Sequence, residues 1–353
     1  MILPPQKSKA HLPACKCRVA SSELKYKIAI ISVEGLPVNA AADAKLKSVG
    51  EVVRVDSRDP HLIEKVSDVD AILVRSAEIT RELIESARKL KIIACQLVGV
   101  DKIDVAAAEK AHITITCAPV GNVSSVAEHV ICLMLALARN ILRINSMVKE
   151  GKWKPRWRLD EIESQPPTLL LDKTLGIIGL GNVGTRVAKR AAAFEMNLLA
   201  HDPYIHMERF QEAGAKSVDL DTLLRDSDIV TVHVPLTSLT RHLIDERKLK
   251  LMKRDALLIN TSRGAVVDEK ALYHALKSRI IRGAALDVRE KEPSEANDPF
   301  YQLDNVILTP HMASVSDQTL IRMSETAAED IIRVLRNEKP LHRYVTQAIP
   351  YPL

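Results

Sequence analysis

The sequence predicts an α/β protein with two doubly wound parallel sheets. From Lys27 onward, short apolar runs rich in β-branched residues alternate with helix-like segments, a pattern typical of parallel sheets covered by helices on both faces. The alternation is interrupted once and then resumes with a glycine-rich turn. With 353 residues, 46% of them apolar, the chain is long enough to bury two separate cores.

The first series predicts five strands and four helices. The strands are expected at 27–33, 51–55, 71–75, 91–96 and 113–118, and the helices at 38–49, 59–66, 81–88 and 104–111. A long helix should follow from Ser124 to about Lys149, capped by Ser124 or Ser125. Because its middle, 130–138, is apolar on every side, we expect that part to be buried in a core or between subunits.

The second series follows a proline-containing segment, 151–171, that is interpreted as a surface loop. Its strands are expected at 174–179, 197–200, 229–234, 256–260, 283–288 and 305–308. A last helix, about 316–336, has no sheet of its own left to cover and should return to the first domain. We therefore predict a substrate domain at 25–123 and 314–353, a cofactor domain at 124–313, and a disordered extension at 1–24.

A glycine fingerprint identifies the ligand class of the second series. Gly179, Gly181 and Gly184 follow an apolar strand and open a helix, the order needed for a tight turn, close approach to a pyrophosphate and helix–strand packing. Asp202 ends the next strand, where a carboxylate accepts hydrogen bonds from ribose hydroxyls. The pattern predicts a Rossmann-type dinucleotide domain. No Arg or Lys directly follows Asp202, which favours NAD over NADP.

Composition argues against several other classes of function. The formal net charge of +5 is mild and the sequence has no long Lys/Arg block, so no nucleic-acid partner is expected. No apolar run approaches the ~20 residues of a membrane helix. The odd count of five cysteines, three of them in apolar runs, predicts reduced core residues and a cytoplasmic protein. Residues 1–24 lack a secretory signal, with an organelle transit peptide as the alternative, and no metal is expected.

Ordered motifs over residues 27–335 resemble the D-isomer specific 2-hydroxyacid dehydrogenases, most of all the phosphoglycerate dehydrogenase branch without a C-terminal regulatory domain. The motifs are Leu73-Val-Arg-Ser76, Gly99-Val-Asp101, Ser125-Val-Ala-Glu-His129, Gly151-Lys-Trp153, Lys173-Thr-Leu-Gly-Ile-Ile-Gly-Leu-Gly181, Val232-His-Val-Pro-Leu236, Asn260-Thr-Ser-Arg-Gly-Ala-Val-Val-Asp-Glu269, Ala285-Leu-Asp-Val288, Glu290-Lys-Glu-Pro293 and Thr309-Pro-His311. The resemblance implies a cofactor domain inserted in a discontinuous, flavodoxin-like substrate domain.

Three residues after predicted strands suit hydride transfer from a 2-hydroxy acid. Arg263 offers a fork of donors for a carboxylate, and His311 is a natural acid/base near neutral pH. An acid beside that imidazole would stabilise the imidazolium and orient it. Both Glu290 and Glu292 are candidates, and only the resemblance selects Glu292. His129, inside an apolar helix, is a further acid/base candidate that we interpret as structural.

The resemblance also implies the remaining contacts. Cofactor contacts fall on Asn182, Val183, Asp202, Val234, Thr261, Ser262, Arg263 and Asp287, the last meeting the nicotinamide carboxamide; substrate contacts fall on Arg75, Ser76, Val98, Gly99 and Arg263. The implied partners are a small anionic 2-hydroxy or 2-oxo acid and a second copy of the chain, through the long helix after Ser124.

The favoured substrate is D-3-phosphoglycerate, oxidised to 3-phosphohydroxypyruvate in serine biosynthesis. Arg75, Ser76 and a basic segment, Lys152, Lys154, Arg156 and Arg158, would meet a phosphate, although the segment can also be read as a solvated loop. Glu78 and the bulky Leu97 depart from the usual pattern and weigh against this substrate. Glyoxylate or hydroxypyruvate reduction is the alternative activity, and a non-catalytic NAD-sensing binding protein is the alternative class.

Overall fold

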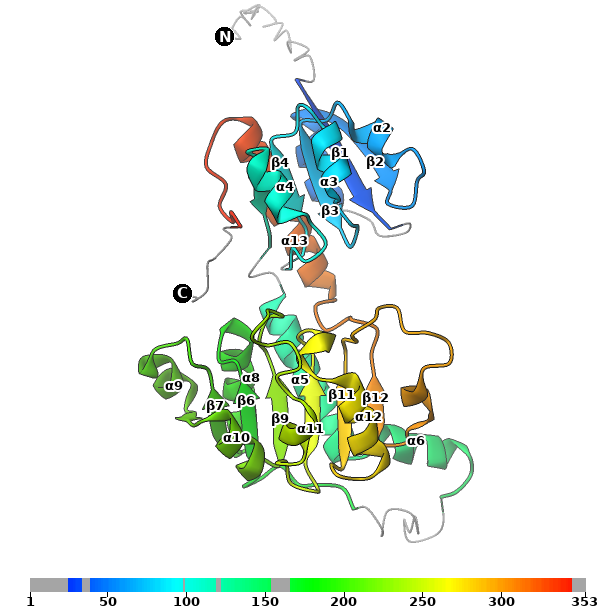
Figure 1. Cartoon of the computed structure of the whole chain (residues 1–353), viewed down its shortest axis with the longest axis vertical. Coiled ribbons are helices and arrows are strands. Elements are labelled where there is room, and N and C mark those ends of the chain that lie inside the picture. The colour runs from blue at the N-terminus through cyan, green and yellow to red at the C-terminus, as the bar shows by residue number, and fades with distance from the viewer. Residues whose placement is uncertain (1–24, 34–38, 98, 119–121, 154–165, 345–353) are drawn as a thin grey trace, which may run out of the picture.

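Two separate parallel sheets organise the chain in the computed structural model, which describes residues 25–33, 39–97, 99–118, 122–153 and 166–344. The two sheets lie in different halves of the molecule, joined by α5 and the segment that leads into α13 (Figure 1). The predicted fold class, two α/β domains with parallel sheets, is confirmed.

The first sheet has five strands in the order β2-β1-β3-β4-β5, all parallel. This is the flavodoxin-like order. Its strands are β1 (Tyr26–Ser32), β2 (Gly50–Asp56), β3 (Ala71–Arg75), β4 (Ile92–Cys95) and β5 (Thr114–Thr116). Every residue of β3 and β4 is buried, as expected for continuous apolar runs in a parallel sheet.

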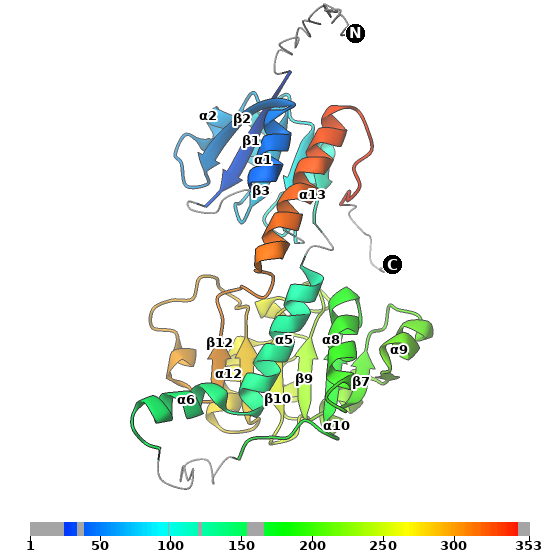
Figure 2. The ribbon, with the colours of Figure 1, turned by 180° about the vertical axis from the view of Figure 1, so that it is seen from behind.

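Helices cover both faces of this sheet. Alternate β1 residues such as Ile28 pack with α1 (Ala40–Lys47) and α13 (Asp317–Leu335), while residues such as Ile31 pack against the opposite layer, α2 (Leu62–Val66), α3 (Arg81–Ser86) and α4 (Val105–Lys110). Helix α13 lies across β3 and β4 beside α1 (Figure 2). The predicted return of the last helix to the first sheet is thus confirmed.

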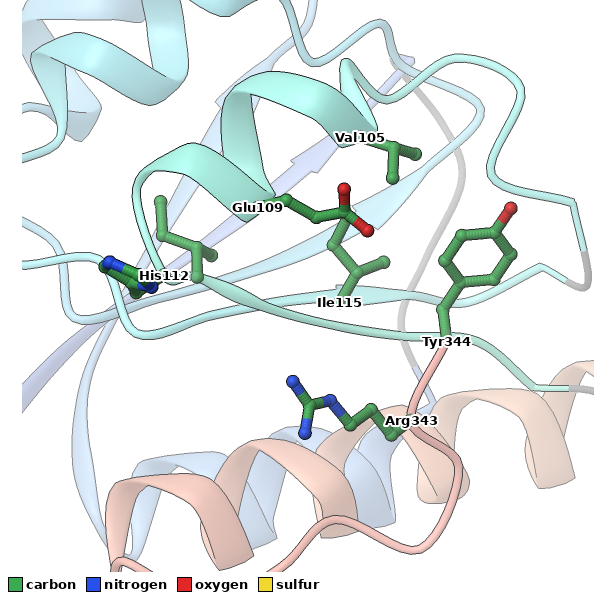
Figure 3. Close-up of a pocket in the computed structure, with 7 residues that line it drawn as sticks. Val105, Glu109, His112, Ile115, Arg343 and Tyr344 are labelled. Carbon is green, nitrogen blue, oxygen red and sulfur yellow. The ribbon is translucent and has the colours of Figure 1, made fainter. Parts of the chain in front are cut away.

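Residues 342–344 pair along the outer edge of β5. The Cys117 N–H donates to His342 O (3.2 Å) and the Tyr344 N–H to Ile115 O (2.8 Å). A cavity of about 380 Å³ lies between this segment and α4. Figure 3 shows Glu109 entering it from α4, with Arg343 and Tyr344 on the C-terminal segment. All of its lining residues belong to the five-stranded half of the chain.

The second sheet has seven parallel strands in the order β12-β11-β10-β9-β6-β7-β8. They are β6 (Thr174–Ile178), β7 (Asn197–His201), β8 (Lys216–Ser217), β9 (Ile229–Val232), β10 (Leu257–Asn260), β11 (Gly283–Leu286) and β12 (Val306–Leu308). The order reverses between β6 and β9, as in a Rossmann-type sheet. Six of these strands are predicted from sequence; β8 is an edge strand of two exposed polar residues, without the apolar run on which such predictions depend.

Helices again form two layers on the second sheet. α5 (Val123–Ala138) and α8 (Asn182–Ala192) pack on one face, and α10 (Leu220–Asp226), α11 (Glu246–Leu249) and α12 (Glu269–Lys277) on the other. α9 (Met207–Ala213) lies beside β8, and the short 3-10 turns are η2 (Gly264–Val266) and η3 (Pro299–Gln302).

The prediction of a single long helix from Ser124 to about Lys149 is wrong. This stretch forms two helices, α5 and α6 (Ile141–Lys149), because Asn140 adopts a left-handed backbone conformation (φ 52°) and the chain bends there by 58°. Asn122, rather than a serine, precedes the first turn, and the Ser125 hydroxyl instead donates to Ala313 O (3.0 Å).

The apolar middle of α5 is buried on one side only. Cys132 is exposed, which corrects the expectation that all three cysteines in apolar runs are core residues; Cys95 is buried and Cys117 is half-buried. Among the described residues, no single helix is long and apolar enough to span a membrane, whereas the bent pair α5–α6 passes that criterion jointly. No His, Cys, Asp or Glu cluster with metal-ligand geometry occurs in the same ranges.

Candidate active site

Three adjacent strands bring the predicted catalytic residues to one edge of the seven-stranded sheet. Arg263 follows β10, Glu292 follows β11 and His311 follows β12, and these strands are neighbours in the order β12-β11-β10. The carboxyl edge of such a sheet is where ligands bind. The alignment of parallel strands therefore gathers residues that are far apart in sequence.

His311 and Glu292 form a close pair. His311 Nδ1 lies 2.7 Å from Glu292 Oε2, and Glu292 Oε1 accepts the Arg289 backbone N–H (2.9 Å). Burial would raise the pKa of Glu292, but hydrogen bonds from His311 and Arg289, with the nearby charge of Arg263, hold this pKa below its usual value of 4.5. The carboxylate is therefore ionised near neutral pH and accepts a proton-bearing Nδ1, which leaves Nε2 as the functional nitrogen of the ring.

The competing carboxylate, Glu290, is engaged elsewhere. Its Oε1 accepts the Glu269 backbone N–H (3.1 Å) and lies 3.1 Å from His242 Nε2. Among the two candidates left open by the residue pattern, the geometry places Glu292 beside His311.

Arg263 reaches across to the five-stranded half of the chain. Its Nε and Nη2 donate to Asp101 Oδ2 (3.2 and 2.8 Å), and Nη1 donates to Ser262 O (2.8 Å). Gly99 makes this approach feasible, because a Cβ there would lie 2.1 Å from Arg263 Nη2. Sequence reasoning assigned no role to Asp101, although it ends one of the motifs that carry the resemblance.

The glycine turn leaves room for a ligand on one side only. Gly179 has a φ of 89°, and a Cβ on Gly184 would lie 2.1 Å from Gly179 O, so these two glycines serve the turn and its packing. A Cβ on Gly181 would meet nothing within 4 Å. Gly181 thus faces open space at the start of α8, where free backbone N–H groups attract phosphate.

Asp202 is fixed beside this turn. Its Oδ2 accepts the Leu180 N–H (2.9 Å) and its Oδ1 accepts the Tyr204 N–H (3.1 Å). Each carboxylate oxygen keeps a further lone pair for a ribose hydroxyl. The hydroxyl of Thr261 is also buried with no hydrogen-bond partner in the described part of the chain. An open cradle, an oriented acid and an orphaned hydroxyl fit a dinucleotide.

The other expected cofactor residues surround these groups. Asn182 begins α8 and its Oδ1 accepts from Arg209 Nη2 (3.1 Å), while the Ser262 hydroxyl donates to Asn260 Oδ1 (2.9 Å). Val183 and Val234 are half-buried and pack against the cores on opposite faces of the sheet.

Asp287 holds the loop that carries His311. Its buried carboxylate accepts the N–H groups of Met312 (2.9 Å) and Ala313 (2.8 Å) and the Thr309 hydroxyl (2.5 Å). Burial would raise the pKa of Asp287, but these hydrogen bonds and one from His129 keep it below its usual value. His129 Nε2 lies 3.1 Å from Thr309 Oγ1, a contact that fits its structural interpretation.

Two of the predicted substrate residues, Arg75 and Ser76, lie at the carboxyl end of β3. Arg75 is only 8% exposed, and burial alone lowers the pKa of its guanidinium. In the described ranges it forms no ion pair, so no carboxylate in those ranges balances its charge. Ser76, in a left-handed conformation (φ 59°), accepts from Lys102 Nζ through its carbonyl (3.3 Å). Val98 lies outside the described residues.

The large side chains of Gln96 and Leu97, in the loop before Gly99, point into the protein. Leu97 packs against the core of the five-stranded sheet, and Gln96 is buried, its amide donating to Ser324 Oγ (2.5 Å). Lys152 instead pairs with Glu150 (2.9 Å) after α6, and the structure does not bring it to Arg75. Lys154, Arg156 and Arg158 lie outside the described residues.

Comparison with known families gives one match over half of the chain. The sequence model of the family described as D-isomer specific 2-hydroxyacid dehydrogenase, NAD binding domain, matches residues 131–313. This range contains the glycine turn, Asp202, Arg263, Glu292 and His311. NAD is accordingly the cofactor of this domain.

Individual relatives extend the similarity to both sheets. The chain is 45% identical to a D-3-phosphoglycerate dehydrogenase of Methanocaldococcus jannaschii, over 86% of this chain but only 57% of that protein. It is 43% identical to a glyoxylate reductase of Korarchaeum cryptofilum, over 79% of this chain and 83% of that protein. The chain thus spans little more than half of the first of these relatives.

Solved structures agree with the sequence relatives. A D-lactate dehydrogenase of Aquifex aeolicus, complexed with NAD and lactic acid, superposes with a TM-score of 0.78 at 31% identity, over 88% of this chain and 96% of that chain.

Proposed function

The chain belongs to the D-isomer specific 2-hydroxyacid dehydrogenases, and on this premise we propose that it transfers a hydride between NAD and C2 of a small D-2-hydroxy acid. The observation that carries the proposal is the His311–Glu292 pair at 2.7 Å beside Arg263, on three neighbouring strand ends. A binding protein without catalysis does not require an acid/base held in this way.

The three residues divide the work of the reaction. Arg263 binds the substrate carboxylate and polarises the oxygen on C2. In oxidation, His311 Nε2 removes the hydroxyl proton while hydride leaves C2, so that the C–O bond becomes a carbonyl; in reduction the proton returns from the same atom. Bound nicotinamide supplies or accepts the hydride. Glu292 orients the ring and stabilises its protonated form.

The test of these roles is kinetic. Arg263→Ala should raise KM and lower kcat together, because both the carboxylate contact and the polarisation are lost. Glu292→Gln should move the pH profile of kcat/KM to lower pH, since the imidazolium loses its anion. An unchanged profile would contradict the role of Glu292.

We favour D-3-phosphoglycerate as the substrate. Arg75 is buried and has no ion pair among the described residues, which favours an anionic group on the ligand, and a charge-assisted contact to a phosphate contributes about 1.5–3 kcal/mol. Because Leu97 packs into the core, the bulk of this loop does not weigh against a large substrate. Glyoxylate or hydroxypyruvate reduction is the second candidate, favoured by the exposed carboxylate of Glu78 close to Arg75 in sequence.

A substrate panel separates these candidates. NADH oxidation is measured with phosphohydroxypyruvate, hydroxypyruvate and glyoxylate, in the wild type and in Arg75→Met. Phosphoglycerate dehydrogenase activity predicts the highest kcat/KM for the phosphorylated acid and a loss of that advantage in the variant. Equal values for the three acids would support the second candidate, and NADH binding without turnover of any acid would support the NAD-sensing alternative.

We further propose that 25–123 with 314–353 bind substrate and 124–313 bind NAD, with closure between them excluding water. The ion pair between Arg263 and Asp101 already joins the two halves of the chain. Small-angle scattering with and without NAD and a substrate analogue tests this, because closure should reduce the radius of gyration.

A homodimer is the expected assembly. Several large apolar side chains on and after α6 are exposed: Ile141, Leu142, Val148 and Trp153. Such a patch is typical of an interface. Light scattering should give twice the chain mass of 39.1 kDa, and Leu142→Glu should lower it. Leu239→Glu, at an exposed leucine elsewhere, is the matched control.

A further inference from the structure

A buried ion cluster lies directly behind the loop that carries Glu292. Its centre is Arg289, whose side chain is 11% exposed although the sequence around it, Arg289-Glu-Lys-Glu, has the composition of a surface segment. The two carboxylates paired with it, Glu269 and Asp298, are 19% and 8% exposed. Charges withdrawn from water to this extent need close partners to persist.

All three nitrogens of the Arg289 guanidinium donate hydrogen bonds. Nε and Nη2 donate to the two oxygens of Glu269 (2.9 and 3.1 Å), and Nη1 donates to Asp298 (2.7 Å) and to the Ser294 hydroxyl (3.2 Å). The guanidinium carbon lies 4.4 Å from the ring centre of Phe300. A fork bound on three sides has one orientation, and it fixes the backbone from which it extends.

That backbone contacts two parts of the candidate active site. The Arg289 N–H donates to Glu292 Oε1 (2.9 Å), and the other oxygen of that carboxylate meets His311. On its other side, a Cβ on Gly264 would lie 1.9 Å from the Arg289 carbonyl carbon, so the turn after Arg263 packs directly on this segment. Glu269, downstream of the same turn, also accepts the Glu290 N–H (2.7 Å).

We propose that Arg289 is a positioning residue that ties the segment after β10 to the segment after β11 and so sets Arg263, Glu292 and His311 relative to one another. The inference rests on the proposed function, since it concerns the geometry of the same three residues. Arg289 acts through Glu292 and the Gly264 turn.

Arg289→Met removes the fork with little change of side-chain length, and Arg289→Lys keeps the charge without the fork. Arg282→Met is the matched control, because Arg282 is a half-buried arginine at the opposite end of β11 that donates to Thr168 and Pro166. A groove of about 430 Å³ opens over the cluster, so water can replace the lost side chain.

The first readout is independent of activity. In ¹⁵N-labelled protein, the Nδ1-bound proton of His311, assigned with His311→Ala, should give a hydrogen-bonded signal in the wild type and in Arg282→Met. Arg289→Met should lose that signal, as should Glu292→Ala, which removes the acceptor, and Arg289→Lys should recover part of it.

The second readout is kinetic. Arg289→Met should lower kcat/KM for the acid by about 10–100-fold, because a misplacement of up to an ångström costs up to roughly 10²-fold. The KM for NAD should change less than kcat/KM for the acid, because the glycine turn and Asp202, which would hold the pyrophosphate and the ribose, lie on other strands. The pH profile of kcat/KM should move to lower pH, as in Glu292→Gln, because a Glu292 displaced from His311 no longer stabilises the imidazolium; His311 and Arg263 are the groups that face this carboxylate.

Either of two results overturns the proposal: an Arg289→Met protein with the wild-type His311 signal and pH profile, or equal losses in Arg289→Met and Arg282→Met. If Arg289→Met does not fold, Arg289→Lys and Glu269→Gln decide the question by the same readouts. A failure of the proposed function can be told apart from a failure of this inference. If the proposed function is wrong, His311→Ala keeps full activity or the wild type turns over no acid. The His311 signal would still report the effect of Arg289 in that case.

Discussion

Gly99 controls where the guanidinium of Arg263 can lie. A Cβ at this position would lie 2.1 Å from Arg263 Nη2 and 2.6 Å from Asp101 Oδ2, whereas ordinary contacts begin at 3.4 Å. In Gly99→Ala the guanidinium must therefore retreat by about 1.3 Å. The backbone of Gly99 is not in the left-handed region, so alanine adds crowding without backbone strain.

A displacement of this size should cost activity and little stability. Misplacing a group that binds the reacting molecule by about 1 Å lowers the rate by roughly 10²-fold, so we expect kcat/KM for the acid to fall about 100-fold. The crowded atoms belong to the ends of partly exposed side chains, which can move at small cost, so Tm should change little. Steady-state NADH oxidation and thermal unfolding are measured on the same preparations.

Asp101→Ala is the control for this interpretation. It removes the same two hydrogen bonds from Arg263 without adding an atom near Nη2. Because the pair is largely exposed, its loss should matter by no more than about 1 kcal/mol, or about fivefold. A Gly99→Ala enzyme with wild-type kcat/KM, or an Asp101→Ala enzyme as slow as Gly99→Ala, would refute the reasoning.

Three further predictions follow from other contacts. His311→Ala should lower kcat by roughly 10²–10⁴ with an unchanged dissociation constant for NADH by fluorescence; retention of kcat would exclude His311 as the acid/base. The wild type should prefer NAD over NADP at least tenfold, about 1.4 kcal/mol, and Asp202→Asn should narrow the ratio of kcat/KM values; equal use of both cofactors by the wild type would contradict the role of Asp202. Burial lowers the pKa of His233 to about 3, whereas a histidine in an unfolded chain has a pKa of about 6.5. As the pH falls, the unfolded state therefore binds a proton before the folded state does, and Tm should fall below pH 6.5. His233→Asn should flatten that dependence between pH 6.5 and 4, and parallel curves for the two proteins would show that His233 does not cause it.

The strands were predictable because they are buried on both faces. In β3 and β4 every side chain is buried, so a continuous apolar run marks them. The order of parallel strands then places residues after β10, β11 and β12 together. Strand β8 and the break at Asn140 carry no such pattern: β8 is two exposed residues, and Asn140 is unusual only in its backbone angle.

The contacts of charged residues were less predictable. Arg289 stands in a run of charges, and composition alone indicates a solvated segment; its burial depends on Asp298 and Phe300 folding back over it. Asp101 and Arg263 are 162 positions apart, and their contact depends on how the two sheets face each other. Such pairings arise from tertiary packing and leave no periodic pattern in the sequence.

The pairing of residues 342–344 with β5 has a consequence for the behaviour of shortened chains. An uncovered edge strand presents unpaired N–H and C=O groups that promote association between molecules. Here the Cys117 and Tyr344 N–H groups are used within the chain, so this segment caps the outer edge of the five-stranded sheet. A chain cut just after α13 would keep every helix and strand named above and still expose that edge, and its first defect would be aggregation rather than loss of catalysis.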